Sequence, residues 1–246
     1  MKKLVIIPTY KEKENVSSIL EAIFSLEKGF HVLIIDDNSP DGTAQIVKEL
    51  QQKYQSELFL QEREGKLGLG TAYILGFKWA LAHGYDYIFE MDADFSHDPK
   101  DLIRLYEACH DNGADLAVGS RYVNGGEIEN WPFSRKLISK GGALYSQFFT
   151  WMPVKDPTAG FVCYKRCVLE AMNLDAIRFI GYAFQIEMKF ASWRLGFKIA
   201  EVPIIFRDRK YGASKMSKGI IQEGVNGVFA MQWQYLFGDY LKRIKK

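Results

Sequence analysis

The sequence predicts an α/β protein with a mainly parallel sheet that helices cover on both faces. Short apolar runs rich in Val, Ile, Leu and Phe recur along the first half of the chain, and segments with helical periodicity separate most of them. Strands that alternate with helices at this spacing form βαβ units, which place helices on both sides of a parallel sheet. With 246 residues, of which 48% are hydrophobic, the chain is long enough to bury one substantial core.

Five strands are predicted in the first half of the chain, at residues 4–8, 31–36, 58–61, 87–91 and 116–120. Apolar residues that recur every three or four positions predict four helices, at about 16–26, 43–54, 71–83 and 99–112. Pro99 suits the first turn of the fourth helix, where its missing N–H costs nothing, and Asp98 is predicted to be the N-cap.

The second half of the chain is less regular. A stretch rich in Gly and aromatic residues covers about 125–165, and its segment 144–153 is open to two interpretations, a buried helix or a lipid contact. We expect a helix at 183–196, a strand at 198–206 and a basic loop at 207–219.

A final helical segment has its apolar residues, from Ile221 to Leu241, on one face and ends in a basic tail. The chain is therefore expected to consist of a domain of residues 1–219 and a C-terminal amphipathic segment of residues 220–246. This segment can lie in a membrane interface, or it can pack on the domain or in a dimer contact.

Composition and charge argue against several classes of protein. The net charge of +2 gives no general attraction to nucleic acid, so an anionic partner needs a local basic cluster such as 207–218. Cys109, Cys163 and Cys167 form no CxxC pair, which favours a reduced compartment and three small core residues. No run approaches the roughly 18 apolar residues of a membrane span, and the first run is too short for a signal peptide. We expect a soluble protein, or one that lies on a membrane without crossing it.

Polar residues follow each predicted strand, and in a parallel sheet these strand ends meet at the edge where ligands bind. Asp36 and Asp37 end the second strand, where a carboxylate can accept a hydrogen bond from a base or a ribose hydroxyl. Asp92 and Asp94 follow the fourth strand, and two carboxylates so close together repel each other unless a cation lies near them. Oxygen ligands that leave coordination positions open suit Mg²⁺ or Mn²⁺ shared with a diphosphate.

Three familiar motifs do not fit this chain. An EF-hand loop starting at Asp92 would need Gly where His97 stands and Glu where Ile103 stands. A P-loop would need Lys followed by Ser or Thr after Gly70, but Thr71 and Ala follow. The GxGxxG fingerprint of dinucleotide-binding proteins is missing after the first strand.

Seven motifs occur in order: IIPTYKEKEN, IIDDNSPDGT, KLGLGTAY, MDADFSHDP, VGSRY, DPTAGF and RKYGASK. Over roughly residues 1–220 the chain therefore resembles the family 2 glycosyltransferases, whose GT-A fold is a Rossmann-like α/β architecture. Within that family it resembles the polyprenyl- (dolichyl-) phosphate mannose synthases. Relatives often continue into transmembrane helices, and we expect a form without them, peripheral on the cytoplasmic face of a membrane.

The resemblance implies an inverting transfer of mannose from GDP-mannose to a polyprenyl (dolichyl-type) monophosphate, giving polyprenyl-phosphate β-mannose, with Mg²⁺ or Mn²⁺ as cofactor. The chemistry agrees with this. An inverting transfer normally needs a carboxylate base, but a phosphate monoester with a second pKa of about 6 is already largely dianionic. Stabilising the departing diphosphate and bringing two anions together are the remaining tasks.

Two other functions stay open. A related enzyme would use UDP-glucose or another nucleotide sugar, and a protein without catalysis would be a nucleotide-sugar-binding subunit. Whether an integral-membrane partner anchors the protein also stays open.

For the donor, the resemblance implies a guanine nucleoside pocket formed by Pro8, Tyr10, Glu12, Ile35 and Asp37.

The DxD element of the resemblance corresponds to Asp92, Ala93 and Asp94. Asp94 would be the direct metal ligand, Asp92 would lie close to metal and sugar, and Ser96 would be a weaker or water-mediated ligand.

The other implied contacts are basic. Arg121 would contact the donor, and Arg135 with Ser139 would hold the acceptor lipid phosphate. Arg209 and Lys215 would clamp the diphosphate from a loop that closes over the donor. The expected catalytic residues are Asp92, Asp94 and Arg135.

Overall fold

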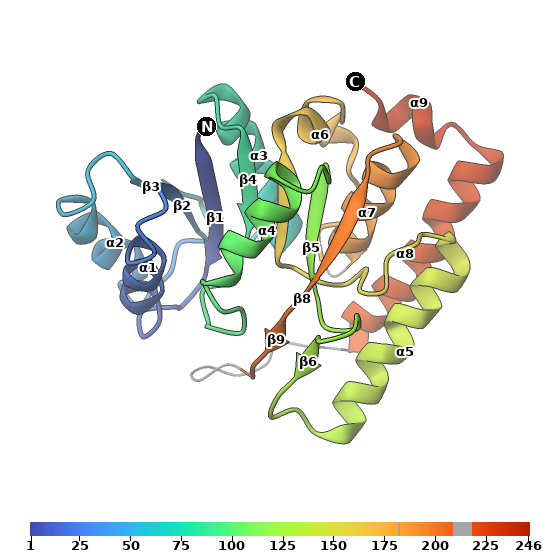
Figure 1. Ribbon diagram of the computed structural model, residues 1–246, viewed down its shortest axis with the longest axis horizontal. Helices are drawn as coiled ribbons and strands as arrows, with labels where there is room; N and C mark the ends of the chain where they lie inside the picture. Colours follow the sequence, from blue (N-terminus) through green and yellow to red (C-terminus); the bar gives the residue numbers. More distant parts are fainter. Residues whose placement is uncertain (182, 209–217) are drawn as a thin grey trace.

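The computed structural model describes residues 1–246 except 182 and 209–217 (Figure 1). Its main sheet has the strand order β3-β2-β1-β4-β7-β5-β8, and every strand is parallel to its neighbours except β7. A second, two-stranded sheet pairs β6 with β9. The strands are β1 Lys3–Thr9, β2 Phe30–Asp36, β3 Leu58–Glu62, β4 Tyr87–Glu90, β5 Leu116–Ser120, β6 Glu127–Ile128, β7 Val162–Lys165, β8 Ile199–Pro203 and β9 Ile205–Phe206.

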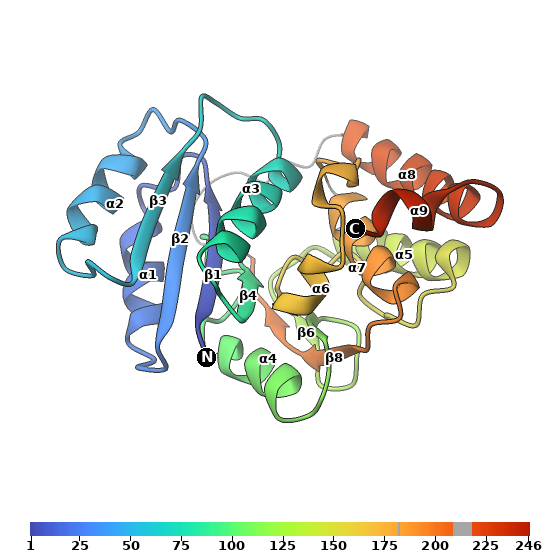
Figure 2. The same cartoon turned by 90° about the horizontal axis from the view of Figure 1, so that it is seen from above.

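Helices cover both faces of the main sheet, as Figure 2 shows from above. The helices α1, α2 and α4 pack on one face, and α3, α6 and α7 pack on the other. The helices are α1 Val16–Phe24, α2 Thr43–Gln51, α3 Leu69–Ala82, α4 Asp101–His110, α5 Phe133–Thr150, α6 Arg166–Glu170, a 3₁₀-helix Leu174–Ala176, α7 Ala183–Arg194, α8 Lys218–Phe237 and α9 Tyr240–Ile244. The predicted α/β architecture with a mainly parallel sheet is confirmed.

The alternation of side chains along β1 explains the two layers of core. Leu4 and Ile6 pack on the α3 face, whereas Val5 and Ile7 pack on the α1 face. All four are fully buried, as expected for a strand that helices cover on both sides. The helix α3 lies close to β1 because Gly76 has no side chain: a Cβ there would come within 2.8 Å of Ile6.

The second half departs from the prediction in three places. The antiparallel strand β7 lies in the middle of the sheet, between β4 and β5. The stretch of Gly and aromatic residues contains one helix of 18 residues, α5. The predicted strand 198–206 is divided at Ile204 into β8, which joins the main sheet, and β9, which pairs with β6.

Two smaller predictions were wrong. Asp98 is not the N-cap of α4, because the helix begins at Asp101, and Asp98 instead closes a turn by accepting the N–H of Lys100 at 3.0 Å. Cys167 is not a core residue: it is exposed on α6, whereas Cys109 and Cys163 are buried.

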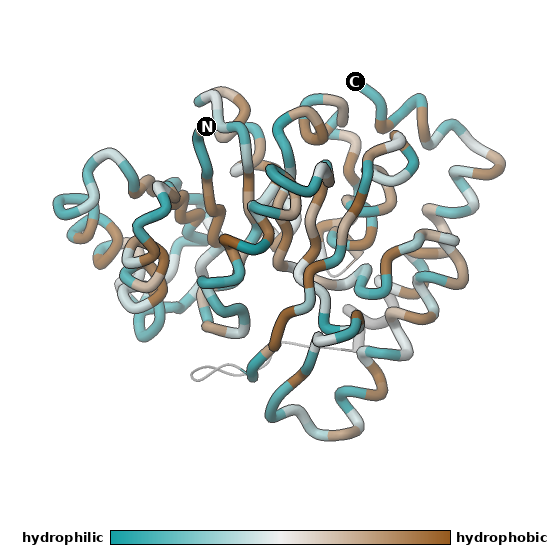
Figure 3. The backbone as a smooth tube through the Cα atoms, in the orientation of Figure 1, coloured by the Kyte–Doolittle hydropathy of each residue, from teal (hydrophilic) through white to brown (hydrophobic). Residues whose placement is uncertain are grey.

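The C-terminal helices pack against the rest of the domain. Val228 and Met231 of α8 belong to the core, and the carbonyl of Val225 accepts the hydroxyl of Tyr145 from α5 at 3.1 Å. Tyr240 and Ile244 of α9 are buried in the same core. Both α5 and α8 contain apolar residues, which appear as brown segments in Figure 3, and many large apolar side chains of these helices are exposed.

Candidate active site

The carboxyl ends of β1, β2, β4 and β5 lie along one edge of the sheet, at the bottom of Figure 1 near β6 and β9. Asp36 is buried at the end of β2, directly opposite Thr9 of β1. Its Oδ1 accepts the hydroxyls of Thr9 at 2.8 Å and Ser39 at 2.7 Å, and its Oδ2 accepts the N–H of Ser39 at 2.8 Å. Asp36 therefore fixes the turn after β2 rather than facing a ligand.

Asp37 is oriented by Arg63, which follows β3. Arg63 Nε lies 2.6 Å from Asp37 Oδ1, and its Nη1 donates to Thr71 Oγ1 at 2.6 Å. Burial raises the pKa of Asp37 above its ordinary value, although the charge of Arg63 opposes this shift. The Asp37 carboxylate is thus held in place at the strand end by a cation.

The other residues predicted for the nucleoside pocket lie around the ends of β1 and β2. Pro8 and Tyr10 are partly exposed there, and Glu12 Oε2 accepts Asn15 Nδ2 at 2.8 Å. Ile35, in contrast, is fully buried in the core on the α3 face.

The loop after β4 carries the DxD element. Asp92 is partly exposed, whereas Ala93, Asp94 and Ser96 are buried. Asp94 Oδ1 accepts the N–H of Ser96 at 3.0 Å, and Phe95 between them has a φ of +60°. This compact turn brings three oxygen-bearing side chains into one short loop.

The donor set of this loop fits a magnesium or manganese ion, which prefers hard oxygen ligands. Within the described part of the chain, no group of three or more His, Cys, Asp or Glu side chains is arranged to hold a metal. A cation held by Asp92 and Asp94 would therefore take its remaining ligands from a substrate diphosphate and from water.

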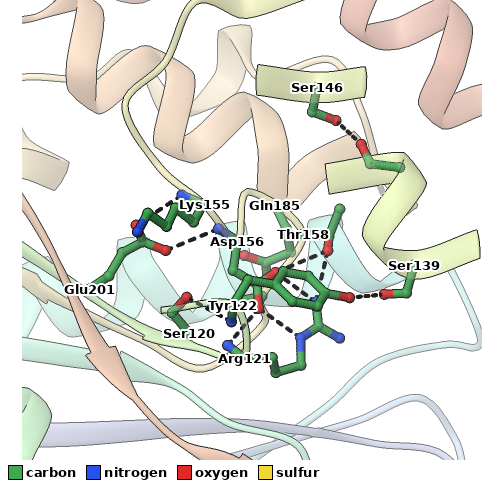
Figure 4. A network of polar contacts seen from close by, with 12 residues as sticks. Ser120, Arg121, Tyr122, Ser139, Ser146, Lys155, Asp156, Thr158, Gln185 and Glu201 are labelled. Carbon is green, nitrogen blue, oxygen red and sulfur yellow. Dashed lines mark hydrogen bonds and ion pairs between the residues drawn. The ribbon is translucent and has the colours of Figure 1, made fainter. Parts of the chain in front are cut away.

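Arg121, directly after β5, is held by Asp156 in a buried ion pair (Figure 4). Its Nε and Nη2 each donate to the Asp156 carboxylate at 2.7 Å, and its Nη2 also donates to Thr158 Oγ1 at 2.8 Å. Burial alone would raise the pKa of Asp156, but the charge and hydrogen bonds of Arg121 outweigh it and hold that pKa below its usual value. Glu201 of β8 orients the Asp156 loop by accepting two backbone N–H groups, at 2.8 and 2.9 Å.

Arg135 and Ser139 lie one turn apart on α5, so both side chains face the same side of the helix. The Arg135 guanidinium lies 3.8 Å from the centre of the Trp131 ring, and its Nη1 donates to Asp208 at 3.1 Å. The Tyr122 hydroxyl donates to Ser139 Oγ at 2.8 Å, a contact drawn in Figure 4.

Phe206, at the end of β9, joins the DxD loop to the two arginines. Its ring meets His97 of that loop at 5.4 Å, Trp131 at 5.3 Å and the Arg121 guanidinium at 5.4 Å. Trp131 in turn stacks on Arg135. The loop carrying two carboxylates and the region carrying two arginines are therefore neighbours.

The two residues after Phe206 strengthen this connection. The N–H of Arg207 donates to the carbonyl of Ser96 at 3.1 Å, and Asp208 accepts the hydrogen bond from Arg135.

Several residues of the site were not predicted. Asp156 begins the motif DPTAGF, but its role as the partner of Arg121 was not predicted. Glu201 could have been suspected as a carboxylate near a buried arginine, although nothing in the spacing identifies it. Arg63 follows the third predicted strand, which places it at the ligand edge, whereas Phe206 has no signal in the sequence pattern. Arg209 and Lys215, predicted to clamp the diphosphate, lie outside the described residues.

The family model described as "Glycosyl transferase family 2" matches residues 4–172. The match covers more than half of the chain, so the chain belongs to this family, as the motifs predicted. The chain is 45% identical over 222 residues to a polyprenol monophosphomannose synthase from Mycolicibacterium smegmatis, covering 90% of this chain and 83% of the relative. It is also 45% identical over 240 residues to an undecaprenyl-phosphate mannosyltransferase from Micrococcus luteus, covering 96% and 98%.

Solved structures share the fold at low identity. Glucosyl-3-phosphoglycerate synthase from Mycobacterium tuberculosis, in complex with Mn²⁺, UDP-glucose and glycerol 3-phosphate, superposes with a TM-score of 0.67 at 18% identity, covering 93% of this chain and 79% of that one. A mannosyltransferase from Pyrobaculum calidifontis, in complex with GDP-Man and Mn²⁺, gives a TM-score of 0.55 at 15% identity, covering 96% and 76%. The GT-A fold implied by the motifs is confirmed by these likenesses.

Proposed function

We propose that the protein transfers mannose from GDP-mannose to a polyprenyl (dolichyl-type) monophosphate, with inversion at the sugar carbon. The observation that carries this proposal is the contact of the DxD loop with the Arg121 and Arg135 region through Phe206. A reaction between two phosphate compounds needs a site for each anion, side by side. The names of the two relatives support mannose as the sugar and a polyprenyl phosphate as the acceptor.

The residues have distinct roles in this reaction. Asp37, held by Arg63, is suited to accept hydrogen bonds from the nucleoside, while Asp92 and Asp94 would hold Mg²⁺ or Mn²⁺. When bound, the metal supplies Lewis-acid stabilisation of the departing diphosphate. Both solved structures named above contain Mn²⁺ with a nucleotide sugar, which supports a divalent metal here.

On the acceptor side, Arg135 and Ser139 would bind and orient the phosphate, since the arginine fork matches phosphate oxygens. An acceptor oxygen forms the new bond to the sugar carbon, and the bond from that carbon to the diphosphate oxygen breaks, so that GDP leaves with the bonding electrons. The dianionic acceptor carries no proton that a base must remove. Arg121, which Asp156 holds close to the same region in an ion pair, would contact the donor.

We also propose that the protein lies peripherally on the cytoplasmic face of a membrane, with residues 220–246 added to the catalytic domain 1–219 as part of the membrane contact. Among the described helices, none combines the length and the apolar character needed to cross a bilayer. The outward stripes of α5 and α8 support the proposal, because they expose large apolar side chains on α5, which also carries Arg135, and on the neighbouring α8. These side chains are Phe133, Leu137, Leu144, Phe148, Trp151, Phe229, Trp233, Leu236 and Phe237.

The test is release of GDP that depends on the acceptor. Purified protein with Mn²⁺, GDP-mannose and a polyprenyl phosphate in vesicles should release GDP and form a mannosylated lipid phosphate, whereas omission of the lipid should stop release. UDP-glucose in place of GDP-mannose tests the alternative donor. If neither donor gives release that depends on the acceptor, the proposal is wrong.

A further inference from the structure

A group of buried charged and polar side chains takes no part in the chemistry proposed above. Lys189 of α7 and Glu90 of β4 are both fully buried, and Gln185 lies one turn before Lys189. Lys189 Nζ donates to the carbonyl of Ala159 at 2.6 Å, and to the carbonyl and Oε1 of Gln185 at 3.1 Å each. Gln185 Nε2 donates to Glu90 Oε2 at 2.6 Å.

The hydrogen bonds from Glu90 to Ala159 join the segment next to the DxD loop with the loop that holds Arg121. Glu90 is the last residue of β4, and the DxD loop follows directly. Ala159 belongs to the loop in which Asp156 and Thr158 hold Arg121. Through the side chains of Gln185 and Glu90, Lys189 therefore connects the strand that precedes the carboxylates with the loop that fixes the arginine.

Stability alone does not explain a lysine at this position. Taking an ammonium group out of water is costly, and a buried charge pair is often no more stabilising than apolar side chains of the same volume. A fully bonded polar group instead restricts its neighbours to one arrangement, because each N–H must meet its acceptor.

We propose that Lys189 is a positioning residue that keeps the Asp156 loop, and with it Arg121, at a fixed distance from the loop of Asp92 and Asp94. The inference rests on the proposed function, because only in that reaction must both loops hold substrate groups next to each other. Transfer requires the acceptor oxygen and the sugar carbon to be in contact, and a displacement of about 1 Å can lower the rate about 100-fold.

The first experiment compares Lys189→Met with the wild type. We expect kcat for mannose transfer to fall about 10- to 100-fold. The Kd of GDP-mannose with Mn²⁺, measured by calorimetry, should stay within about twofold, because the predicted nucleoside pocket and metal ligands are unchanged. The ratio of donor hydrolysis to transfer should rise, since the donor still binds but meets a misplaced acceptor.

A second variant separates positioning from folding. Glu90→Gln combined with Lys189→Met removes both buried charges, so the melting temperature should recover towards that of the wild type while kcat remains low. Ser192→Ala is the matched control: Ser192 is also buried and polar on α7, but its hydroxyl donates within the helix, to the carbonyl of Met188, at 2.8 Å. Its kcat should equal that of the wild type.

The outcomes are distinct. A folded double variant with the kcat of the wild type would overturn the positioning role, whatever the single variant does. Wild-type protein that does not turn over GDP-mannose with the lipid acceptor would instead overturn the proposed function, and the inference with it.

Discussion

Asp94 and Asp101 lie seven residues apart in one segment, yet their surroundings differ. Asp94 is buried in the loop after β4, where its carboxylate meets the N–H of Ser96. Asp101 lies in the first turn of α4, where its carboxylate pairs with Arg104 at 2.7 Å. A negative charge near a helix N-terminus is stabilising, so the position of Asp101 is explained by the structure of α4 alone.

This contrast gives the first prediction. Asp94→Asn should lower acceptor-dependent GDP release by at least about 100-fold, because several kcal/mol of charge stabilisation at the diphosphate are lost. Asp101→Asn should leave turnover within about twofold, since its partner lies on the protein surface. Turnover of Asp94→Asn at the wild-type rate would rule out a metal at the DxD loop.

A second prediction concerns the ion pair of Arg121 with Asp156. Asp156→Asn leaves the buried guanidinium uncompensated, so we expect a loss of about 3–5 kcal/mol in the free energy of unfolding, measured by urea denaturation. The matched control is Glu62→Gln, which breaks an ion pair with Lys48 whose side chains are both about half exposed. That change should cost less than about 1 kcal/mol. If Asp156→Asn and Glu62→Gln lower the free energy of unfolding by the same amount, burial does not decide the strength of the Arg121–Asp156 pair.

The same pair predicts a dependence on pH. The pKa of Asp156 is lower in the folded than in the unfolded state, so its contribution to stability is present above the unfolded pKa of about 3.9 and is lost as pH falls through the folded pKa. The difference in unfolding free energy between the wild type and Asp156→Asn should therefore be constant from pH 5 to 7 and shrink below about pH 4. A difference that grows on acidification would contradict this assignment.

At the scale of elements, α5 and α8 form a pair with an outward apolar surface. Phe148 of α5 and Phe237 of α8 are 74% and 70% exposed, and Trp233 is 56% exposed. The ring of Phe229 lies 6.3 Å from that of Phe149, so the two helices present their aromatic stripes side by side. Exposed apolar side chains that gather in one patch are typical of a binding site.

We predict that Phe148→Ser, Trp233→Ser and Phe237→Ser together lower co-sedimentation with polyprenyl-phosphate vesicles at least about tenfold, because each ring loses apolar burial in the lipid. Turnover of a short, water-soluble acceptor should persist. Leu75→Ser, at an exposed apolar position of α3, is the control. Deleting residues 220–246 would be a poorer test, because it removes Val228 and Met231 from the core. Unchanged sedimentation of the triple variant would place the lipid contact elsewhere.

Some of the elements and site loops could be predicted from the sequence, and others could not. The strands β1 to β5 were recognisable because each is a buried apolar run followed by polar residues, and the DxD loop and Asp37 could be placed at strand ends for this reason. The helix α5 was obscured by Gly141 and Gly142, which lower helix propensity. The strand β7 is only four residues long and contributes no ligand, so no motif marked it as part of the sheet. Contacts made by distant segments, such as Phe206 with His97, depend on the folded chain.

At the scale of the whole molecule, the proposed reaction would bring the two substrates together along one edge of the sheet. The ends of β1, β2 and β4 would hold the donor, with Arg121 after β5, and α5 would hold the acceptor phosphate. Because Asp92 and Asp94 would hold the metal beside the donor diphosphate, the metal and the donor should each strengthen binding of the other.

The last prediction follows from this sharing. GDP-mannose with Mn²⁺ at about 100 times its Kd should stabilise the fold by about 2.7 kcal/mol, which raises the melting temperature by roughly 5–10 °C. GDP-mannose without metal should give a much smaller rise, and Asp94→Asn should remove the effect of the metal. An equal rise with and without Mn²⁺, measured by differential scanning fluorimetry, would contradict a shared site.

The position of β7 has a consequence for synthesis of the chain. The strand β4 carries the DxD loop at its end, but its partner on one side, β7, leaves the ribosome roughly 70 residues later, which takes about 4–14 s. Until then the edge of β4 that β7 will cover has unpaired N–H and C=O groups, which can pair with other chains. The sheet on this side of β4 is thus completed only after β7 has been made, and until then β4 is an open edge exposed to pairing with other chains.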